Sequence, residues 1–268
     1  MNEYYNIFFL YIAGCAGGFL SGLLGVGGGI IFVPIFDYFL KKNGVSANDL
    51  VSYTLANSFF SVMISGFTGS FSAFRNKNFD LKHFFSVSVA AIVFILITTF
   101  LINKGQWYSP VKFKIFFCVM LIFTLIKTWF HNSKNNNTEK MNIKIGLITG
   151  SVTGIVSGLS GLGGGVIMIP MFTILGNMNI KKASLLSLAV IPVLALPSVI
   201  YYAIENPFIS LNYSTGYIAW LLVLPVVVGV ITTVKIGLNT AKLLSADTIK
   251  TIFAAFIIVT LIKIITSI

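Results

Sequence analysis

The sequence predicts an all-α integral membrane protein built from two inverted repeats, each a glycine-broken helix followed by three transmembrane helices. Hydrophobic residues make up 56% of the 268 residues and charged residues only 9%, against about 25% charged in soluble domains. Apolar stretches of about 20 residues, long enough to cross a bilayer, recur from Ile7 onward. A glycine-rich motif also occurs in both halves of the chain. Little of the chain is left for a soluble domain.

The glycine-rich motif defines the repeat. GLLGVGGGIIFVP at 22–34 recurs as GLSGLGGGVIMIP at 158–170, at an offset of 136 residues. The loop that follows is three residues shorter in the second half, which places Thr54 opposite Ser187. Other positions that keep the offset of the motif are Gly14, Gly18 and Ser21, with Gly150, Gly154 and Ser157 as their counterparts. An internal repeat of this kind indicates two copies of one structural unit.

The repeat fixes the expected order of the elements. The first repeat is 1–131, with a broken helix at 7–40 and spans at about 49–72, 83–103 and 110–130. The second repeat is 143–268, with a broken helix at 143–176 and spans at about 183–204, 213–235 and 246–266. The polar run HNSKNNNTEK introduces a linker at 132–142. Ser109 is a good N-cap with proline directly after it, which supports a helix start at 110.

Each broken helix can either cross the membrane as a discontinuous helix or enter to mid-depth and return as a hairpin. The hairpin gives the clearer excess of lysine and arginine on one side, as cytoplasmic loops require. It also leaves three crossings in each half, an odd number, so the halves would face opposite sides as an inverted repeat. The sequence favours the hairpin, and the discontinuous crossing helix stays open.

The clustered glycines predict breaks in the helices. Gly14, Gly18 and Gly22 have the spacing of helix-packing contacts, but four clustered glycines at about 1 kcal/mol each disfavour a continuous helix. A break at membrane depth must be buried in protein or line a cavity. The half-helices that begin near Ile30 and Val166 would direct amide groups and positive dipole ends at that cavity. The sequence therefore predicts an anion site at the midplane.

Hydroxyl and amide side chains next to the breaks complete the predicted site. The predicted substrate-binding residues are Ser21, Gly25, Gly27, Gly28, Gly29, Thr54, Asn57, Ser157, Ser160, Gly161, Gly163, Gly164, Gly165 and Ser187. Each hydroxyl can instead bond to a carbonyl of its own helix. Almost no basic residue lies deep in the predicted spans, so dipoles, amides and hydroxyls are expected to balance the charge of the anion.

Other classes of function have little support. The net charge of +11 comes from lysines in short tracts, which act as topology signals and lipid partners rather than as a nucleic-acid surface. The glycine run is not GxGxxG, and His83 and His131 lie near span ends without a catalytic set. Cys15 and Cys118 lack metal or redox spacing. We expect no enzyme activity, no cofactor and no metal site.

Coupling to an ion is left open by the sequence. The seven acidic residues all fall near loops or helix ends. Asp37 and Asp49 flank the exit of the first motif and are the candidates for carrying a proton; a solvated position at the membrane interface is the alternative. Unwound backbone carbonyls could instead hold Na⁺. Carrier or channel, import or export, and the oligomeric state are not decided by the sequence.

The doubled G-x-x-G-x-G-G-G-x-x-x-x-P motif resembles that of the sulfite exporter TauE/SafE family, and the resemblance covers the whole chain. It implies a secondary transporter for a small anion, such as sulfite, thiosulfate or an organosulfonate, in a bacterial-type cytoplasmic membrane. The alternatives are an anion channel and a carrier of another small organic anion such as a carboxylate. The implied partners are the anion, membrane lipids and a coupling ion, H⁺ or Na⁺.

Overall fold

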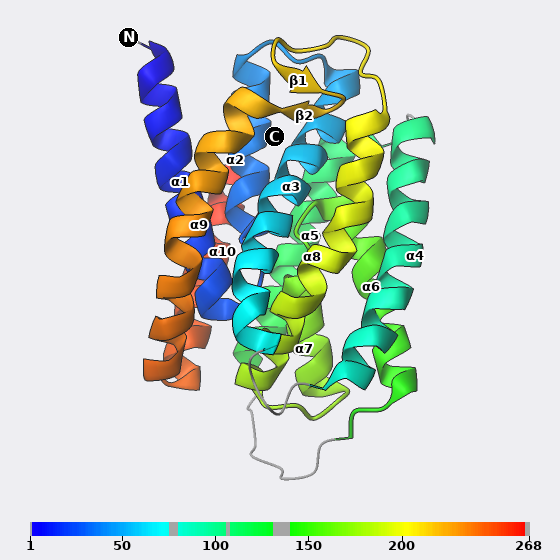
Figure 1. Cartoon of the computed structure of the whole chain (residues 1–268), viewed down its shortest axis with the longest axis vertical. Coiled ribbons are helices and arrows are strands. Elements are labelled where there is room, and N and C mark those ends of the chain that lie inside the picture. The colour runs from blue at the N-terminus through cyan, green and yellow to red at the C-terminus, as the bar shows by residue number, and fades with distance from the viewer. Residues whose placement is uncertain (1, 75–79, 106–107, 131–139, 266–268) are drawn as a thin grey trace.

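The computed structural model describes residues 2–74, 80–105, 108–130 and 140–265 as one helical bundle (Figure 1). In the first half the helices are α1 (Asn2–Leu24), α2 (Gly29–Lys42), α3 (Ala47–Phe74), α4 (Leu81–Gly105) and α5 (Pro110–Phe130). In the second half they are α6 (Ile143–Ser160), α7 (Gly165–Ile174), α8 (Ile180–Ile204), α9 (Trp220–Leu243) and α10 (Ala246–Ile265). Most of the predicted linker, residues 132–139 of 132–142, lies outside the described residues.

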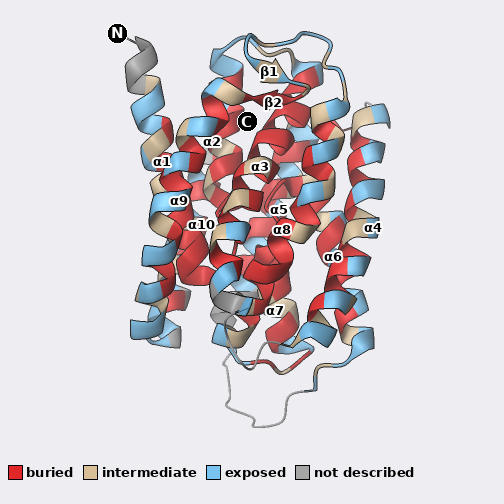
Figure 2. Ribbon diagram, in the orientation of Figure 1, coloured by how far each residue is buried: buried red, intermediate tan, exposed pale blue. Residues whose placement is uncertain are grey.

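The bundle is apolar both inside and outside. Buried residues follow the faces between helices, and exposed residues lie on the outer faces (Figure 2). Large hydrophobic side chains such as Phe8, Phe71 and Phe85 are exposed there, as lipid-facing side chains are. Six of the described helices are long and apolar enough to cross a membrane: α1, α3, α4, α6, α8 and α9. The protein is therefore an all-α, multi-pass membrane protein.

Both broken elements return to the end of the bundle from which they start. Lys42, at the end of α2, donates from Nζ to Asn6 Oδ1 near the start of α1, at 3.1 Å. The amide of Lys140, just before α6, donates to Gly176 O, just after α7, at 3.0 Å. Figure 1 shows the two hairpins opening at opposite ends of the bundle. Each broken element is therefore a hairpin in this structure rather than a discontinuous helix that crosses the bundle.

Small residues let the first arm of each hairpin lie against a long helix. A methyl group added at Gly14 would lie 2.1 Å from Val226 O, and one added at Gly22 would lie 2.0 Å from Val234 O, so α1 and α9 touch backbone to backbone. Gly150 and Gly154 meet the backbone of α4 in the same way. These glycines serve helix packing, as their spacing predicts.

One predicted span has the wrong bounds. Residues 213–235 were expected to form a helix, but a hairpin of β1 (Ser214–Thr215) and β2 (Ile218–Ala219) precedes α9. The chain turns at Tyr213 and Gly216, which have positive φ angles of 56° and 54°. Helix α9 then continues past Lys235 to Leu243. The Lys235 side chain is exposed, and a long lysine at such a position can reach toward water.

Candidate functional site

The two glycine runs break the helices by the same backbone conformation. Gly25, Gly27 and Gly28 have φ angles of 76°, 85° and 79°. Their counterparts in the second half, Gly161, Gly163 and Gly164, have φ angles of 70°, 74° and 80°. Residues with a Cβ atom rarely adopt these angles. The six glycines therefore end one helix and begin the next, as the sequence predicts.

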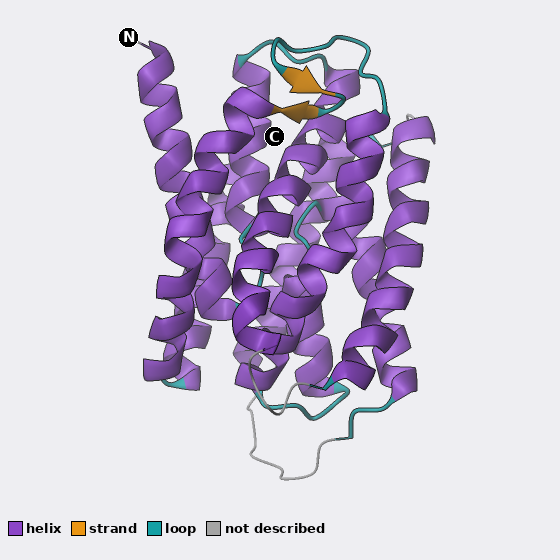
Figure 3. Cartoon of the chain, viewed as in Figure 1, coloured by secondary structure: helices purple, strands orange, loops and turns teal. Residues whose placement is uncertain are grey.

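The two breaks meet inside the bundle. Figure 3 shows them as short loop segments among the helices, away from both ends. A methyl group added at Gly29 would lie 2.7 Å from Leu162 Cα, and one added at Gly165 would lie 2.6 Å from Val26 Cα. Each half-helix thus begins directly against the opposite break, and we name this region the break junction. Gly29 and Gly165 are required there for close approach rather than for a positive φ.

Two half-helix N-termini lie at the break junction. Gly28 is the N-cap of α2 and Gly164 the N-cap of α7, and neither helix has a side-chain cap. The amides of Ile31 and Phe32 bond back to Gly28 O, and those of Ile167 and Met168 bond to Gly164 O. Helix starts such as these carry a partial positive charge that favours anions.

Hydroxyls from two long helices hold the first carbonyl of each break. Ser58 on α3 donates to Gly161 O at 2.7 Å. Ser187 on α8 donates to Gly25 O at 2.9 Å. Both side chains are fully buried. The structure therefore places Ser187 at the junction, where it bonds to the backbone, and adds Ser58, which the sequence analysis did not select.

Three other predicted site residues also have protein partners. Ser65 Oγ donates to Ser21 Oγ at 2.5 Å, and Ser160 Oγ donates to Val156 O of its own helix at 2.7 Å. Asn57 lies on α3, where its Nδ2 donates to Tyr217 O and its Oδ1 accepts from the amide of Ala219. Asn57 therefore fastens the start of α9 to α3.

Thr54 and Ser157 differ from these residues. Their side-chain oxygens are buried and have no hydrogen-bond partner in the described part of the chain. A buried hydroxyl without a partner costs about 1–3 kcal/mol. Helix hydroxyls usually avoid this cost by bonding to a carbonyl one turn earlier, as Ser151 and Ser160 do here. Thr54 and Ser157 remain available to a ligand.

Two further hydroxyls on α6 were not among the predicted site residues. Thr149 and Thr153 are also fully buried and have no partner among the described residues. With Ser157 they occupy every fourth position, so they lie on one face of α6. Thr153 touches the second break, because a methyl group at Gly164 would lie 2.4 Å from its Cγ2. The fourfold spacing was a signal for this hydroxyl row, Thr149, Thr153 and Ser157.

A buried lysine contradicts one expectation. Lys114 on α5 was not expected to lie deep in the protein, yet its side chain is only 7% exposed. Its Nζ lies 3.7 Å from Asp37 Oδ2, and the same oxygen accepts from Lys41 Nζ at 2.9 Å. Asp37 is buried as well, so it is not a solvated interfacial residue. The sequence does not reveal this cluster because the two helices are far apart in the chain.

Asp49, the other candidate for carrying a proton, is fully buried and occupied by structural partners. It accepts from the amides of Phe208 and Ile209 and from the hydroxyl of Tyr217. Burial and the neighbouring carboxylate raise the pKa of Tyr217 above its ordinary value, so its hydroxyl stays protonated and donates. Asp49 thus closes one end of the bundle by holding the loop before α9.

No group of three or more metal-ligating side chains occurs in the described residues.

Comparison with known protein families gives a match over most of the chain. The TauE family pattern, described as sulfite exporter TauE/SafE, matches residues 10–264. The chain is 30% identical over 258 residues to a probable membrane transporter protein of Haemophilus influenzae, covering 92% of this chain and 94% of that protein.

A probable membrane transporter protein of Methanocaldococcus jannaschii is 25% identical over 235 residues, covering 86% of this chain and 84% of that protein. The family match spans both hairpins and all the long helices. The chain belongs to the sulfite exporter TauE/SafE family of membrane proteins.

Proposed function

We propose that the protein is a secondary transporter for a small anion, which binds at the break junction. The observation that carries this proposal is the meeting of two half-helix starts, α2 and α7, inside a membrane bundle. Thr54 and Ser157 have unpartnered hydroxyls. Ser157 accepts from the Gly161 amide through its carbonyl, and Thr54 lies one helical turn from Ser58, which donates to Gly161 O. Sulfite is the substrate in the name of the family, and we propose thiosulfate and organosulfonates beside it because they are also small sulfur oxyanions. The protein has no enzymatic role in this proposal.

The chemistry of the junction sets the expected affinity. Each dipole end, amide or hydroxyl contributes about 0.3–2 kcal/mol toward an anion. A few such contacts give a dissociation constant in the high-micromolar to millimolar range, where 1 mM corresponds to about 4 kcal/mol. Weak binding suits a transporter, which must also release its substrate. Small and compact anions fit best, because the two breaks approach each other closely.

The two halves provide a route for alternating access. We propose that they form an inverted repeat related by an axis in the membrane plane, with each hairpin reaching the junction from its own side. Rocking of one hairpin against the other would then open the junction to each side in turn. Gly29 and Gly165 contact the opposite backbone in the present structure. This tight contact favours a carrier over an open anion channel.

Flux measurements in proteoliposomes test the proposal. The purified protein is reconstituted and supplied with sulfite, thiosulfate, sulfoacetate, taurine or acetate, with empty liposomes as the control. A carrier should show saturable uptake and counterflow for at least one sulfur oxyanion. A channel would instead give ohmic current without counterflow, and preference for acetate would indicate a carboxylate carrier. Absence of flux for all five compounds would refute the proposed substrate class.

A further inference from the structure

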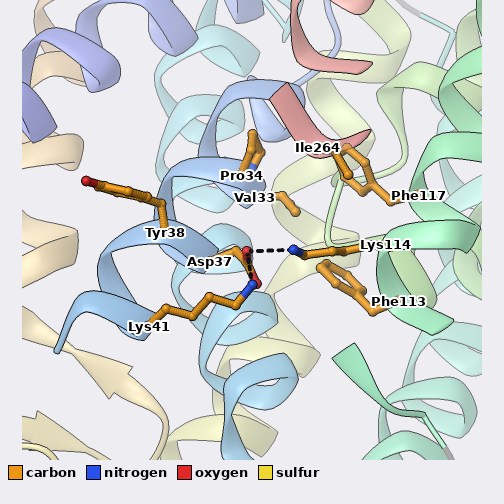
Figure 4. A pocket seen from close by; sticks show the side chains of 9 residues that line it. All are labelled: Val33, Pro34, Asp37, Tyr38, Lys41, Phe113, Lys114, Phe117 and Ile264. Atoms are coloured by element: carbon orange, nitrogen blue, oxygen red, sulfur yellow. Dashed lines mark hydrogen bonds and ion pairs between the residues drawn. The ribbon is translucent and has the colours of Figure 1, made fainter. Parts of the chain in front are cut away.

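We propose that Asp37 binds the coupling proton of this transporter and that Lys114 is its buried counter-charge. The inference rests on the proposed function, because it concerns how ion movement drives the anion. Asp37 and Lys114 face each other across a cavity of about 150 Å³ between α2, α5 and α10 (Figure 4). The other residues that line it are Val33, Pro34, Tyr38, Lys41, Phe113, Phe117 and Ile264.

The carboxylate of Asp37 has one partner near the surface and one inside. Lys41 is one helical turn further along α2 and its side chain is 40% exposed, whereas that of Lys114 is 7% exposed. Both ammonium groups approach the same oxygen, Asp37 Oδ2, at 2.9 Å and 3.7 Å. The carboxylate therefore lies between a partly exposed ammonium group and a buried one.

Burying an ion pair in an apolar helix bundle costs desolvation free energy. Two apolar side chains of similar size are often as stable as a buried pair or more so. The rest of the cavity wall is mainly aromatic and aliphatic, so it does not require these charges for packing. The pair is therefore better explained by a role in transport than by stability.

The cavity shares its wall with the break junction. Val33 lines the cavity, and a methyl group at Gly161 in the second break would lie 3.3 Å from its Cγ2. Phe113 also lines the cavity and packs its ring against Tyr108, whose hydroxyl donates to Leu159 O at 2.8 Å, just before the same break. These contacts connect the cavity to the junction, and in this proposal they are the route by which a change of charge at Asp37 affects the junction.

Charge balance gives the direction of the coupling. When Asp37 is protonated, two lysine charges lose the carboxylate that both contact, and an anion at the neighbouring junction offsets them. Proton binding and anion binding then favour each other, and by linkage the effect is reciprocal. The proton and the anion therefore move together, as in symport. A lower pH on one side of the membrane should accelerate anion entry from that side.

The surroundings of Asp37 contain few other titratable groups among the described residues. Tyr38 is on the same helix but points away from the pair in Figure 4. Helix α10 contributes Ile264 to the cavity, and α1 packs the ring of Phe9 against Phe39 of α2. The carboxylate of α3, Asp49, bonds to the segment before α9 instead. Lys41 and Lys114 are therefore the charged groups of the described residues that lie directly beside the Asp37 carboxylate.

The first arm of the test measures proton-driven transport. Asp37→Asn and Asp247→Asn are compared with the wild type in proteoliposomes, using the panel anion that the wild type carries best. When the outside is about one pH unit more acidic than the inside, the wild type should accumulate the anion up to about tenfold per coupled proton. Asp37→Asn should lose this accumulation but keep anion exchange at equal pH. Asp247→Asn, at an exposed carboxylate on α10, should behave as the wild type.

The double variant Asp37→Asn/Lys114→Gln removes both charges and guards against misfolding, because it leaves no buried lysine without its carboxylate. It should fold and exchange anions without response to pH. Normal proton-driven accumulation by folded Asp37→Asn, or by the double variant, would overturn the assignment of Asp37.

The second arm needs no substrate. Infrared difference spectra of the purified protein, recorded along an acid titration, report carboxyl groups that gain a proton. The wild type and Asp247→Asn should show a protonated-carboxyl band that Asp37→Asn lacks. If the band is unchanged in Asp37→Asn, Asp37 is not the proton carrier, whatever the anion panel shows. A band from Asp37 without any flux in the panel would overturn the proposed anion substrates instead.

Discussion

The two hairpins have the same backbone but different side chains. Each ends its first arm at three glycines of positive φ, and each begins its second arm against the break of the other. At the offset of 136 residues, Ala13 and Gly17 of α1 correspond to Thr149 and Thr153 of α6. Asp37 of α2 corresponds to Thr173 of α7. The first hairpin thus carries the charges and the second carries the hydroxyl row.

This difference separates what the backbone supplies from what the side chains supply. The breaks and the half-helix starts are duplicated, because both hairpins must reach the junction. The charged cluster and the hydroxyl row of α6 are not duplicated in the described residues. We infer a division of labour, in which the first hairpin responds to the coupling proton and the second provides most of the hydroxyl contacts to the anion.

The largest expected effect comes from removing a break. Gly28→Leu and Gly164→Leu introduce a large side chain at φ angles of 79° and 80°. A methyl group there already meets Gly17 O at 2.6 Å or Thr153 Cγ2 at 2.4 Å. Both variants should abolish transport while leaving some folded protein in the membrane, which flux and detergent size-exclusion profiles measure together.

Gly44→Ala is the matched control for backbone strain. Gly44 also has a positive φ, 75°, but a methyl group there would touch nothing within 4 Å. This variant should keep nearly normal transport despite the strained backbone. If the leucine variants at the breaks transport as well as Gly44→Ala does, the glycines are not needed to shape the junction.

The sequence predicted the breaks, because clustered glycines report backbone conformation directly. It also predicted that Gly14 and Gly22 pack helices, which the contacts with α9 bear out. It did not predict that Asn57 holds the start of α9 or that Lys114 meets Asp37. Those partners come from helices far apart in the chain, and one sequence does not show which helix faces they present to each other.

An intermediate effect is expected from the hydroxyls that have no protein partner. Ser157→Ala, Thr153→Val and Thr54→Val each remove one donor from the region of the junction. Each should weaken anion binding roughly three- to thirtyfold, equivalent to about 0.5–2 kcal/mol. The melting temperature without substrate should not fall, because no protein hydrogen bond is lost. Competition binding and thermal melting, measured on the same preparations, test both statements.

Thr124→Val is the matched control for these variants. Thr124 is fully buried on α5, but its hydroxyl donates to Met120 O of its own helix at 2.8 Å. Its replacement should leave the affinity for the anion unchanged. Equal losses of affinity in Thr124→Val and Ser157→Ala would mean that the α6 hydroxyls act through packing alone.

A smaller effect on transport is expected from the hydroxyls that do have partners. Ser187→Ala frees the carbonyl of Gly25, and Ser21→Ala leaves Ser65 without its acceptor. A lost buried hydrogen bond costs about 0.5–1.5 kcal/mol, so both variants should melt at lower temperature than the wild type. Their affinity for the anion should change less than that of Ser157→Ala. The opposite ranking would place the anion beside the first hairpin.

The smallest effect is expected from lysines at the surface of the bundle. Lys235 lies on α9 with its side chain exposed on the outside of the bundle, where a long lysine reaches toward the membrane interface. Lys235→Gln should change the affinity for the anion less than about twofold, because the substitution removes no group from the break junction and an exposed charge contributes little. Lys235→Arg keeps the charge and controls for effects on membrane orientation. If Lys235→Gln abolishes flux, Lys235→Arg restores it and Ser157→Ala transports normally, a lysine holds the anion and the break junction does not.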